Sequence, residues 1–588
     1  MEHIEIVPID GGTMIAEWDV PIRLSDGTVL RADVFRPDDD QPHPVLMTHG
    51  PYGKWLSFAQ GFPGMWNVLE QRHPEALAGS SNRYQVWETP DPEKWVPHGY
   101  ACVRVDSRGS GRSPGRVDIF SEVETRDFAE CIEWAGTQPW SSGRVGLSGV
   151  SYYAMNQWQV AALAPPHLAA ICPWEGASDY YREFIRHGGI LSTFYRDWYD
   201  ATVIRTQHGL GQSGEVSAIN GELVSGPETL TPAQLEANRP SHLTDLHEHR
   251  LVDDYHRARS PRLEDITVPV LSAANWAHHL HTRGNFEGYL RAGSSEKWLE
   301  VHGLEHWVEY YTPYGVELQR QFFDYYLHGK DNGWPERAPV VLNVRHVDGS
   351  FSSRDEEAWP IPRTRWTRLS LDAGGSSLVP DGTAEPGVVE VTRDRPATFV
   401  LAAQDTAIEL TGPLSARLSV SAQAEDVDVF LTLRVIDPSG VDVALRSALD
   451  PAGVITAGWL RASHRSLDPD RSTPERPYHP HDREVPLEPG EITELEVEIW
   501  PTSIVIPPGY RLALTVTATD FAFPGDGPWP HLYGIPMRGN GIFLHDDPRD
   551  RPEGAGSFRV HTGGEHASSL LVPIVPDEDG ARSEVRFH

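Results

Sequence analysis

The chain has 588 residues, of which 39% are hydrophobic and 10% aromatic, and its formal net charge is −34. Single hydrophobic cores stop growing near roughly 250–300 residues, so a chain of this length predicts two or three domains. The basic residues are scattered among acids without any Lys/Arg run. Nucleic acid and anionic membrane surfaces are therefore not expected as partners.

The cysteines and the first residues of the chain indicate the cellular compartment in which we expect the protein. Cys102, Cys131 and Cys172 lie in apolar segments, and their odd number suits reduced, buried thiols. The chain does not begin with a cationic segment followed by an apolar run, so no signal peptide is expected. No apolar window approaches the ~20 residues that span a bilayer. We therefore expect a soluble, cytoplasmic protein.

The predicted elements of the first zone alternate between strand and helix. The segments VPIRL and LRADVF flank the turn residues SDGT, which predicts an opening hairpin. Later strands are predicted at PVLMTH, ACVRVD, RVGLSG and AAICPW, with helices at RDFAECIEWAG and YAMNQWQVAALA between them. This alternation is typical of a mostly parallel sheet with helices on both faces.

The strand signal disappears between residues 173 and 261. Helices are predicted there at YYREFI, STFYRDWYDATVI and PAQLEANR, and the sheet pattern resumes with VPVLSAAN and KWLEVHG. We therefore interpret 173–261 as a helical cap inserted into a sheet domain of residues 1–172 and 262–350. Such an insertion lies over the carboxyl ends of the strands, where α/β sheets bind ligands.

From residue 351 to 588 the helical pattern ceases. Segments such as LSARLSVSA and YRLALTVTATD alternate with period two and are separated by Pro, Gly and Asp turns. This pattern predicts an antiparallel sandwich or jelly roll. We expect this all-β domain to pack on the sheet domain and to frame its site or to form the interface of a homo-oligomer.

A candidate nucleophile lies in GLSGVSYYAMN, residues 146–156. Ser151 follows an apolar strand and precedes a helical run, which is the context of a nucleophile elbow. The usual G-x-S-x-G motif has a glycine where this chain has Tyr153. A serine that only caps the helix is the alternative interpretation.

Further stretches carry a resemblance. GVSYYAMNQWQ, VRVDSRGSGRSPG, THGPYGK and GWLRASHRSLDP together resemble the α/β-hydrolase family of bacterial cocaine esterases, α-amino-acid ester hydrolases and X-prolyl dipeptidyl aminopeptidases. That family's motif is G-x-S-Y-x-G, so Tyr153 fits it and only Ala154 departs from it. The resemblance covers nearly the whole chain. It implies an α/β-hydrolase domain with a helical cap and a C-terminal jelly roll, working through an acyl-enzyme without cofactor or metal.

The resemblance also implies roles for individual residues. Ser151 is the nucleophile, and the Tyr52 hydroxyl with the backbone N–H of Tyr152 forms the oxyanion hole. Such donors stabilise the tetrahedral intermediate. The family's histidine follows the last strand in G-P-W-x-H, and His306 of HGLEHW aligns with it, so His302 is expected to have a structural role.

The acid of the expected triad is displaced. The family pattern is G-W-x-D, but residues 275–278 read Asn-Trp-Ala-His, so His278 stands in the acid's place. A serine hydrolase still needs a group that orients the imidazole. Glu175 follows the sixth strand at the active-site end of the sheet, and we expect it to serve. Asp179 is the second candidate.

HGLEH also fits H-x-x-E-H, a zinc-protease pattern. That chemistry requires both histidines on one face of a helix. Here a strand directly precedes His302 and Gly303 follows it, so a helix is not expected. HHLH at 278–281 offers further nitrogens, yet no carboxylate ligand stands out. We therefore expect no metal.

Substrate-binding candidates lie mainly in and near the cap. The aromatic residues there divide between packing and an acyl or aryl pocket, and His278 is a further candidate. The substrate-binding prediction comprises Trp174, Tyr181, Phe184, Trp198 and His278. The cap acids that are candidates for holding a substrate amine are Glu183, Asp197 and Asp200, which we interpret as a solvated helix face.

The sequence thus predicts a serine hydrolase that cleaves an ester or amide bond of a small-molecule acyl substrate. An X-prolyl dipeptidyl peptidase is the alternative enzyme, and it would need an acidic clamp that cannot be identified. A non-catalytic binding protein of the same fold is the alternative from another class. The altered acid site suggests it, and the retention of Ser151, His306 and Tyr52 speaks against it.

Overall fold

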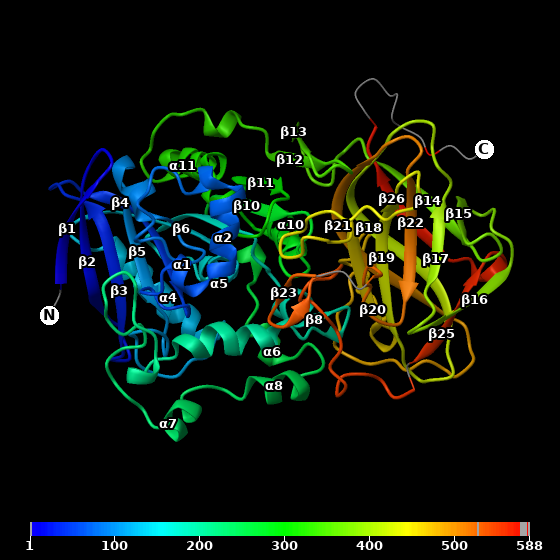
Figure 1. Ribbon diagram of the computed structural model, residues 1–588, viewed down its shortest axis with the longest axis horizontal. Helices are drawn as coiled ribbons and strands as arrows, with labels where there is room; N and C mark the ends of the chain where they lie inside the picture. Colours follow the sequence, from blue (N-terminus) through cyan, green and yellow to red (C-terminus); the bar gives the residue numbers. More distant parts are fainter. Residues whose placement is uncertain (1–2, 526–528, 555, 577–584, 586–588) are drawn as a thin grey trace.

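Two lobes make up the chain, an α/β lobe and a β lobe, which lie side by side in Figure 1. Each is built on an 11-stranded sheet. The structure is a computed structural model and describes residues 3–525, 529–554, 556–576 and 585. No helix among these residues is long and apolar enough to cross a membrane. The cysteines are free and buried, as expected.

The first sheet has the strand order β1-β2-β3-β5-β4-β6-β7-β10-β11-β12-β13. Its central strands from β5 to β12 pair in parallel, and antiparallel strands complete both edges. The predicted, mostly parallel sheet and its opening hairpin are confirmed. The strands are β1 (His3–Ile9), β2 (Gly12–Arg23), β3 (Val29–Pro37), β4 (His43–Gly50), β5 (Ala101–Asp106), β6 (Ser141–Val150), β7 (Leu168–Trp174), β10 (Val270–Asn275), β11 (Lys297–His302), β12 (Val340–Arg345) and β13 (Phe351–Glu356).

Helices cover both faces of this sheet because its buried strands are apolar on both sides. Met47 packs in the cluster that contains Phe128 and Trp158, whereas its neighbour Leu46 packs in the cluster of Phe322. Successive residues of a strand point to opposite faces, so these clusters lie on opposite faces. The helices concerned are α4 (Glu122–Gly136), α5 (Tyr152–Ala161) and α11 (Pro313–Tyr326), and α10 (Thr282–Arg291) packs on β10 and β11.

The segment predicted as a cap, residues 173–261, lies between β7 and β10 in chain order. It consists of short helices and loops, with a hairpin of two two-residue strands that the sequence pattern did not indicate. Its elements are η3 (Tyr180–Ile185), β8 (Arg186–His187), β9 (Ile190–Leu191), α6 (Phe194–Trp198), η4 (Tyr199–Val203), η5 (Ile204–Thr206), η6 (Gly211–Ser213), α7 (Pro232–Ala237), α8 (His242–Glu248) and α9 (Asp254–Arg257). Figure 1 shows α6, α7 and α8 along one side of the α/β lobe.

A second helical segment connects β4 to β5, where the sequence analysis assigned no elements. It contains α1 (Phe58–Gly61), α2 (Pro63–Arg72), η1 (Pro74–Ala76), α3 (Pro92–Trp95) and η2 (Val96–His98). Helix α2 begins at a proline, which suits the first helical position because its missing N–H has no acceptor there. This segment forms part of the wall around the site described below.

The predicted domain boundary at residue 350 is wrong by one strand. β13 pairs antiparallel with β12 over Phe351–Glu356 and therefore belongs to the first sheet. It is an edge strand with mostly exposed or half-exposed side chains, so its sequence resembles a surface strand of a β domain. The α/β lobe thus extends through Glu356.

The second lobe consists mostly of strands. Its order is β16-β25-β18-β21-β20-β19-β22-β17-β15-β14-β26, and β26 also pairs with β18, which closes a ring. Every pair is antiparallel except β15 with β17. The strands are β14 (Arg365–Asp372), β15 (Ser377–Pro380), β16 (Gly387–Thr392), β17 (Ala397–Leu401), β18 (Ile408–Ser421), β19 (Asp428–Ile436), β20 (Thr456–Arg461), β21 (Thr493–Ile506), β22 (Arg511–Thr517), β25 (Ser557–Thr562) and β26 (Ser569–Ile574).

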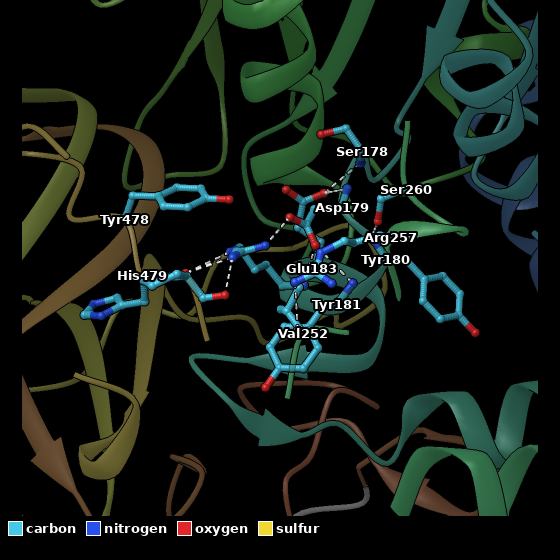
Figure 2. A network of polar contacts seen from close by, with 12 residues as sticks. Ser178, Asp179, Tyr180, Tyr181, Glu183, Val252, Arg257, Ser260, Tyr478 and His479 are labelled. Carbon is cyan, nitrogen blue, oxygen red and sulfur yellow. Dashed lines mark hydrogen bonds and ion pairs between the residues drawn. The ribbon is translucent and has the colours of Figure 1, made fainter. Parts of the chain in front are cut away.

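Buried polar contacts join the cap to both lobes. Arg283 of α10 donates to Glu183 in the cap at 2.7 Å and to Glu498 of β21 at 3.0 Å. Arg182 donates to the backbone carbonyl of His479, a loop residue of the β lobe that Figure 2 shows beside the cap residues. Removing one partner from a buried ion pair is costly, so these contacts fix the cap in place.

Candidate active site

Ser151 lies on a sharp turn between β6 and α5. Its φ is 57°, a left-handed value that a serine rarely adopts. Its N–H donates to the carbonyls of Trp174 and Glu175, both at 3.1 Å, which holds the turn. A Cβ at Gly149 would lie 2.5 Å from Cβ of Tyr153, so the close approach of β6 to α5 requires glycine at this position. The side chain of Ser151 makes no capping hydrogen bond, and the geometry is that of the predicted elbow.

The histidine in contact with Ser151 is His281. Nε2 of His281 lies 3.0 Å from Oγ of Ser151. Nδ1 of His281 accepts from the backbone N–H of Ala177 at 2.9 Å, so the neutral ring carries its proton on Nε2. Burial, followed by the nearby His306, lowers the pKa of His281 well below its usual value. His281 is therefore a neutral donor to the serine oxygen and is in the wrong tautomer to accept its proton.

Glu175 contacts His306, as the sequence analysis expected. Oε2 of Glu175 lies 2.8 Å from Nδ1 of His306, within the range for a hydrogen-bonded triad acid. The other carboxylate oxygen accepts from Nε2 of His302 at 2.9 Å. Burial opposes the ionisation of Glu175, but the two histidines outweigh it and lower its pKa.

Asp179, the second candidate for the acid, serves the cap instead. Its Oδ1 accepts from the backbone N–H groups of Tyr181 and Arg182 at the start of η3. Its Oδ2 accepts from the Arg182 guanidinium at 2.7 Å. Figure 2 shows Asp179 within this network. These contacts use both carboxylate oxygens, so Asp179 is a helix cap and not the partner of His306.

His306 is also bonded to Glu88, a residue that the sequence analysis missed. Nε2 of His306 lies 3.0 Å from Oε1 of Glu88, so the ring lies between two buried carboxylates. Burial opposes protonation of this ring, but Glu175 and Glu88 raise the pKa of His306 to about 9. Burial raises the pKa of Glu88 to about 7, although His306 opposes this shift. No motif marks Glu88, which lies in a loop and has a φ of 62°.

His302, for which a structural role was expected, lies between two carboxylates. Its Nδ1 lies 2.8 Å from Glu300, and its Nε2 bonds Glu175, so the ring bridges two carboxylates. Burial opposes protonation, but Glu300 and Glu175 raise the pKa of His302 to about 10. A protonated His302 therefore fixes the orientation of Glu175, which in turn holds His306.

His278, which stands in place of the family aspartate, faces the other histidines. Its ring centroid lies 4.4 Å from that of His281 and 4.7 Å from that of His306. Nδ1 of His278 accepts from the backbone N–H of Leu280 at 3.2 Å. Burial and the neighbouring imidazoles lower the pKa of His278 well below its usual value. A neutral imidazole in this position cannot replace the charge of a carboxylate.

The three histidines form a cluster that must be tested as a metal site. One ring nitrogen of each of His278, His281 and His306 lies within 4.8 Å of the others. A metal-bound imidazole carries its proton on the opposite nitrogen, which then donates to a neighbour. In His278 and His281 that opposite nitrogen accepts a backbone N–H instead. Only His306 has the tautomer that a metal requires, so the donor set does not fit a metal ion.

The zinc-protease interpretation of HGLEH is also wrong. His302 ends strand β11, and His306 lies in the loop before η8 (Glu309–Tyr311). The two histidines therefore share no helix face, which the H-x-x-E-H chemistry requires. Both of them hold Glu175.

The predicted oxyanion donors lie beside the elbow. Tyr52 follows β4, lines the same cavity as Ser151, and accepts at its hydroxyl from Nε1 of Trp198 at 3.2 Å. Burial and then Glu88 raise the pKa of Tyr52 well above its usual value, which keeps the hydroxyl protonated. Tyr152 is the first residue of α5, so its N–H has no helical acceptor. Its own hydroxyl donates to Glu124 and points away from the site.

A small cavity of about 40 Å³ surrounds Ser151. We call it the inner cavity. It contains Trp198 and His278, as expected, but not the other three predicted substrate-binding residues. Trp174 stacks on His302, the Tyr181 hydroxyl donates to the carbonyl of Arg250, and Phe184 packs among cap aromatics. The lining residues are Tyr52, Phe62, Met65, Trp87, Glu88, Ser151, Phe194, Trp198, Thr202, His278, Leu280, His281, His306, Leu449, Leu532, Tyr533 and Ile542.

The cap acids do not reach this cavity. Glu183 is buried, accepts from the backbone N–H groups of Ser178 and Asp179, and pairs with Arg283. Figure 2 shows Glu183 in the same network as Asp179. Asp197 pairs with Arg196. No cap carboxylate therefore lines the inner cavity among the described residues, and Glu88 from the β4–β5 segment is the acid that does.

Comparison with known proteins places the chain in a family. Residues 26–308 match the model for X-Pro dipeptidyl-peptidase (S15 family), and residues 332–571 match the C-terminal non-catalytic domain of the same peptidase. A CocE/NonD family hydrolase from Staphylococcus aureus has 32% identity and a TM-score of 0.82, over 98% of this chain and 97% of that one. The chain belongs to the cocaine esterase/X-prolyl dipeptidyl aminopeptidase (CocE/NonD) family.

Two further proteins extend the comparison. Cocaine esterase from Rhodococcus sp. (strain MB1 Bresler) is 25% identical to this chain. The match covers 96% of this chain and 100% of the cocaine esterase. An aminopeptidase from the marine sediment archaeon Thaumarchaeota archaeon has the same fold, with a TM-score of 0.66 at 16% identity over 98% of this chain and 96% of its own. The predicted resemblance is confirmed, and this CocE/NonD protein is a serine hydrolase whose α/β lobe is the catalytic one.

Proposed function

We propose that this protein is an esterase that hydrolyses carboxylic esters of small acyl groups, with Ser151 as the nucleophile. One observation carries the proposal. Ser151 lies on a strained elbow in the same small cavity as His306, whose far nitrogen is held by Glu175. This is the relationship of nucleophile, base and acid that acyl transfer requires. No cofactor is needed for this chemistry.

Acylation begins when Oγ of Ser151 attacks the substrate carbonyl carbon. The oxygen already accepts a hydrogen bond from His281, so its own proton is free to pass to His306. Glu175 keeps the proton of His306 on Nδ1, which leaves Nε2 as the accepting nitrogen. The Tyr52 hydroxyl and the Tyr152 N–H stabilise the oxyanion. His306 then protonates the leaving alcohol. In the second half of the reaction His306 takes a proton from a water molecule, which attacks the acyl-enzyme and releases the carboxylic acid from Ser151.

Glu88 competes with the serine for His306. In the structure Nε2 of His306 is directed at Glu88, and a protonated ring cannot act as a base. His306 must therefore lose one proton and turn its Nε2 lone pair from Glu88 to Ser151 before the first step. Glu88 thus sets the pH at which the base becomes available.

An X-prolyl dipeptidyl peptidase is the second candidate, and one observation favours it. Oε2 of Glu88 is buried at the inner cavity without a hydrogen-bond partner among the described residues, so it offers an acceptor to a substrate ammonium group. Ester hydrolysis is preferred because Oε1 of the same carboxylate is already engaged by His306. A dedicated clamp for an amine would present carboxylates that have no other partner.

For the β lobe we propose the jelly-roll topology expected from its sequence, and a cytoplasmic location for the protein. The antiparallel pairing of all its strands except β15 with β17 supports the first, and the free, buried cysteines support the second. The lobe also supplies Leu449, Leu532 and Tyr533 to the inner cavity. It therefore frames the site.

The test is hydrolysis of p-nitrophenyl acetate together with covalent labelling by a fluorophosphonate. We expect wild-type protein to turn over the ester and to be labelled at Ser151, and the Ser151→Ala variant to do neither while keeping its circular dichroism spectrum. Excess EDTA should leave the rate unchanged. Faster turnover of glycyl-prolyl-p-nitroanilide than of the ester would favour the peptidase. Labelling or turnover that survives Ser151→Ala would contradict the nucleophile.

A further inference from the structure

A larger cavity of about 730 Å³ adjoins the inner cavity. We call it the outer chamber. Six residues line both spaces, so the two are neighbours across common walls: Phe62, Met65, Thr202, Leu449, Leu532 and Tyr533. A substrate at Ser151 that extends past these six residues would enter the outer chamber.

The lining of the outer chamber is largely apolar and also carries positive charge. Its charged lining residues are Arg72, Arg205, Arg446 and Glu305, although the whole chain has a formal net charge of −34. Arg205 is neutralised by Glu215, which lies outside the lining. The net charge of the chamber lining is therefore positive, whereas that of the whole chain is negative.

Arg72 and Arg446 share a single carboxylate. Arg72 lies 3.2 Å and Arg446 2.9 Å from the same atom, Oε1 of Glu305. The arginine side chains remain 47% and 40% exposed, whereas that of Glu305 is 7% exposed. One carboxylate cannot satisfy two guanidinium groups with five N–H donors each. The pair therefore retains donors and net positive charge that suit a second carboxylate.

The position of His306 shows which part of the substrate reaches this chamber. His306 protonates the leaving oxygen, so the leaving group must lie on its side of the reacting carbon. The residues on either side of it, Glu305 and Trp307, both line the outer chamber. The inner cavity, at about 40 Å³, has room only for a small acyl group.

We propose that the outer chamber binds the leaving group of the ester, an apolar alcohol that carries a carboxylate, and that Arg72 and Arg446 hold this carboxylate. The proposal rests on the esterase function and assigns its substrate class: small acyl esters of anionic, largely apolar alcohols. The apolar body of the alcohol packs on residues such as Met65, Trp307 and Leu449.

The test compares 3-(4-acetoxyphenyl)propionate with its methyl ester. The two substrates share the scissile acetate, and the propionate spacer insulates the phenol electronically, so they differ mainly in charge. The readout is a ratio of two kcat/KM values for hydrolysis of the acetate group. The value for the free acid is divided by the value for its methyl ester. We expect Arg72→Gln and Arg446→Gln each to lower this ratio roughly two- to fivefold, the size of a partly exposed charge pair. The double variant should lower it further.

The matched control is Arg395→Gln, an exposed arginine on the β lobe that should leave the ratio unchanged. Phenyl acetate, which has no anionic group, reports damage to the chemistry alone, so each Arg72 and Arg446 variant should lose more rate on the acid substrate than on phenyl acetate. A double variant whose ratio equals that of the wild type would overturn the anion site. Parallel losses on all substrates would also overturn it, because they would show damage to the chemistry and not to recognition.

A binding measurement separates this proposal from the esterase function. The product analogue 3-(4-hydroxyphenyl)propionate is titrated into Ser151→Ala protein by calorimetry, with its methyl ester as the uncharged reference. Tighter binding of the acid, lost in Arg72→Gln/Arg446→Gln, supports the site even if no ester is hydrolysed. Equal binding of acid and methyl ester contradicts the site even if phenyl acetate is turned over.

Discussion

His281 donates a hydrogen bond of 3.0 Å to the oxygen of Ser151, while Nε2 of His306 is directed at Glu88. The nucleophile is therefore in contact with a histidine that the family pattern does not identify. The backbone N–H of Ala177 fixes the tautomer of that histidine, so His281 positions and polarises the serine oxygen. Proton transfer remains with His306, which, unlike His281, has a carboxylate on its Nδ1.

Replacing the two histidines separately should distinguish these roles. We expect His306→Ala to lower kcat for p-nitrophenyl acetate by about 10²–10⁴, the usual contribution of a general base. His281→Ala removes one donor to the serine and should cost about tenfold. Steady-state kinetics on folded variants measure both. If His281→Ala lowered kcat as much as His306→Ala, the role of general base would have to be reassigned to His281.

Glu175→Gln should lower kcat by up to ~10⁴, because an amide no longer holds the imidazole in the required tautomer. His278→Ala should cost little in the chemical step, since this neutral ring contacts no reacting proton. Asp179→Asn is the matched carboxylate control and should lower thermal stability more than kcat, because Asp179 caps η3. Parent-rate hydrolysis by Glu175→Gln would leave His306 without its acid and would refute the displaced triad.

Glu88→Gln should shift the pH profile toward acid. His306 acts as a base only when neutral, and its pKa is raised to about 9, so activity should rise as the pH approaches that value. Removing the charge of Glu88 lowers the pKa of His306, so the acid limb of kcat/KM moves to lower pH and the rate at pH 7 increases. An unchanged inflection in Glu88→Gln would show that this carboxylate does not control the base.

A fragment of residues 1–356 should be inactive or insoluble. It contains the complete first sheet, including β13, but lacks Leu449, Tyr533 and Ile542 from the wall of the inner cavity. It also exposes Arg283 and Glu183 without Glu498. Expression with solubility and esterase assays measures the outcome. A soluble fragment with full activity would show that the β lobe is an independent module.

Much of the fold could be predicted because its signals are local. The strand runs and helical patterns around Leu46, Met47 and Phe128 are set by burial on both faces of a sheet, and the structure follows them. The placement of Glu175 was also predictable, because this residue directly follows the strand Leu168–Trp174, β7, whose end lies at the active-site edge of the sheet. The edge strand β13 was assigned to the wrong lobe because exposed strands look alike in either domain.

The missed residues depend on contacts between distant segments. Glu88 lies in an irregular loop with a left-handed backbone, and nothing near it in the sequence indicates that it meets His306. His281 had a weak signal in HHLH, but its role depends on a hydrogen bond from Ala177 in another segment. Trp174 and Tyr181 were assigned to the pocket by residue type, and their side chains face His302 and Arg250 instead.

The inner cavity takes part of its wall from Tyr533 and Ile542, near the carboxyl end of the chain, although its nucleophile is Ser151. During synthesis on the ribosome, the elbow and its histidines therefore emerge long before the wall that encloses them. A nascent chain carries the reactive serine in an open, hydrated setting, where proton transfer and oxyanion stabilisation are weak. We therefore expect acyl transfer to become efficient only after the segment that contains Tyr533 and Ile542 has been synthesised and has folded against the elbow.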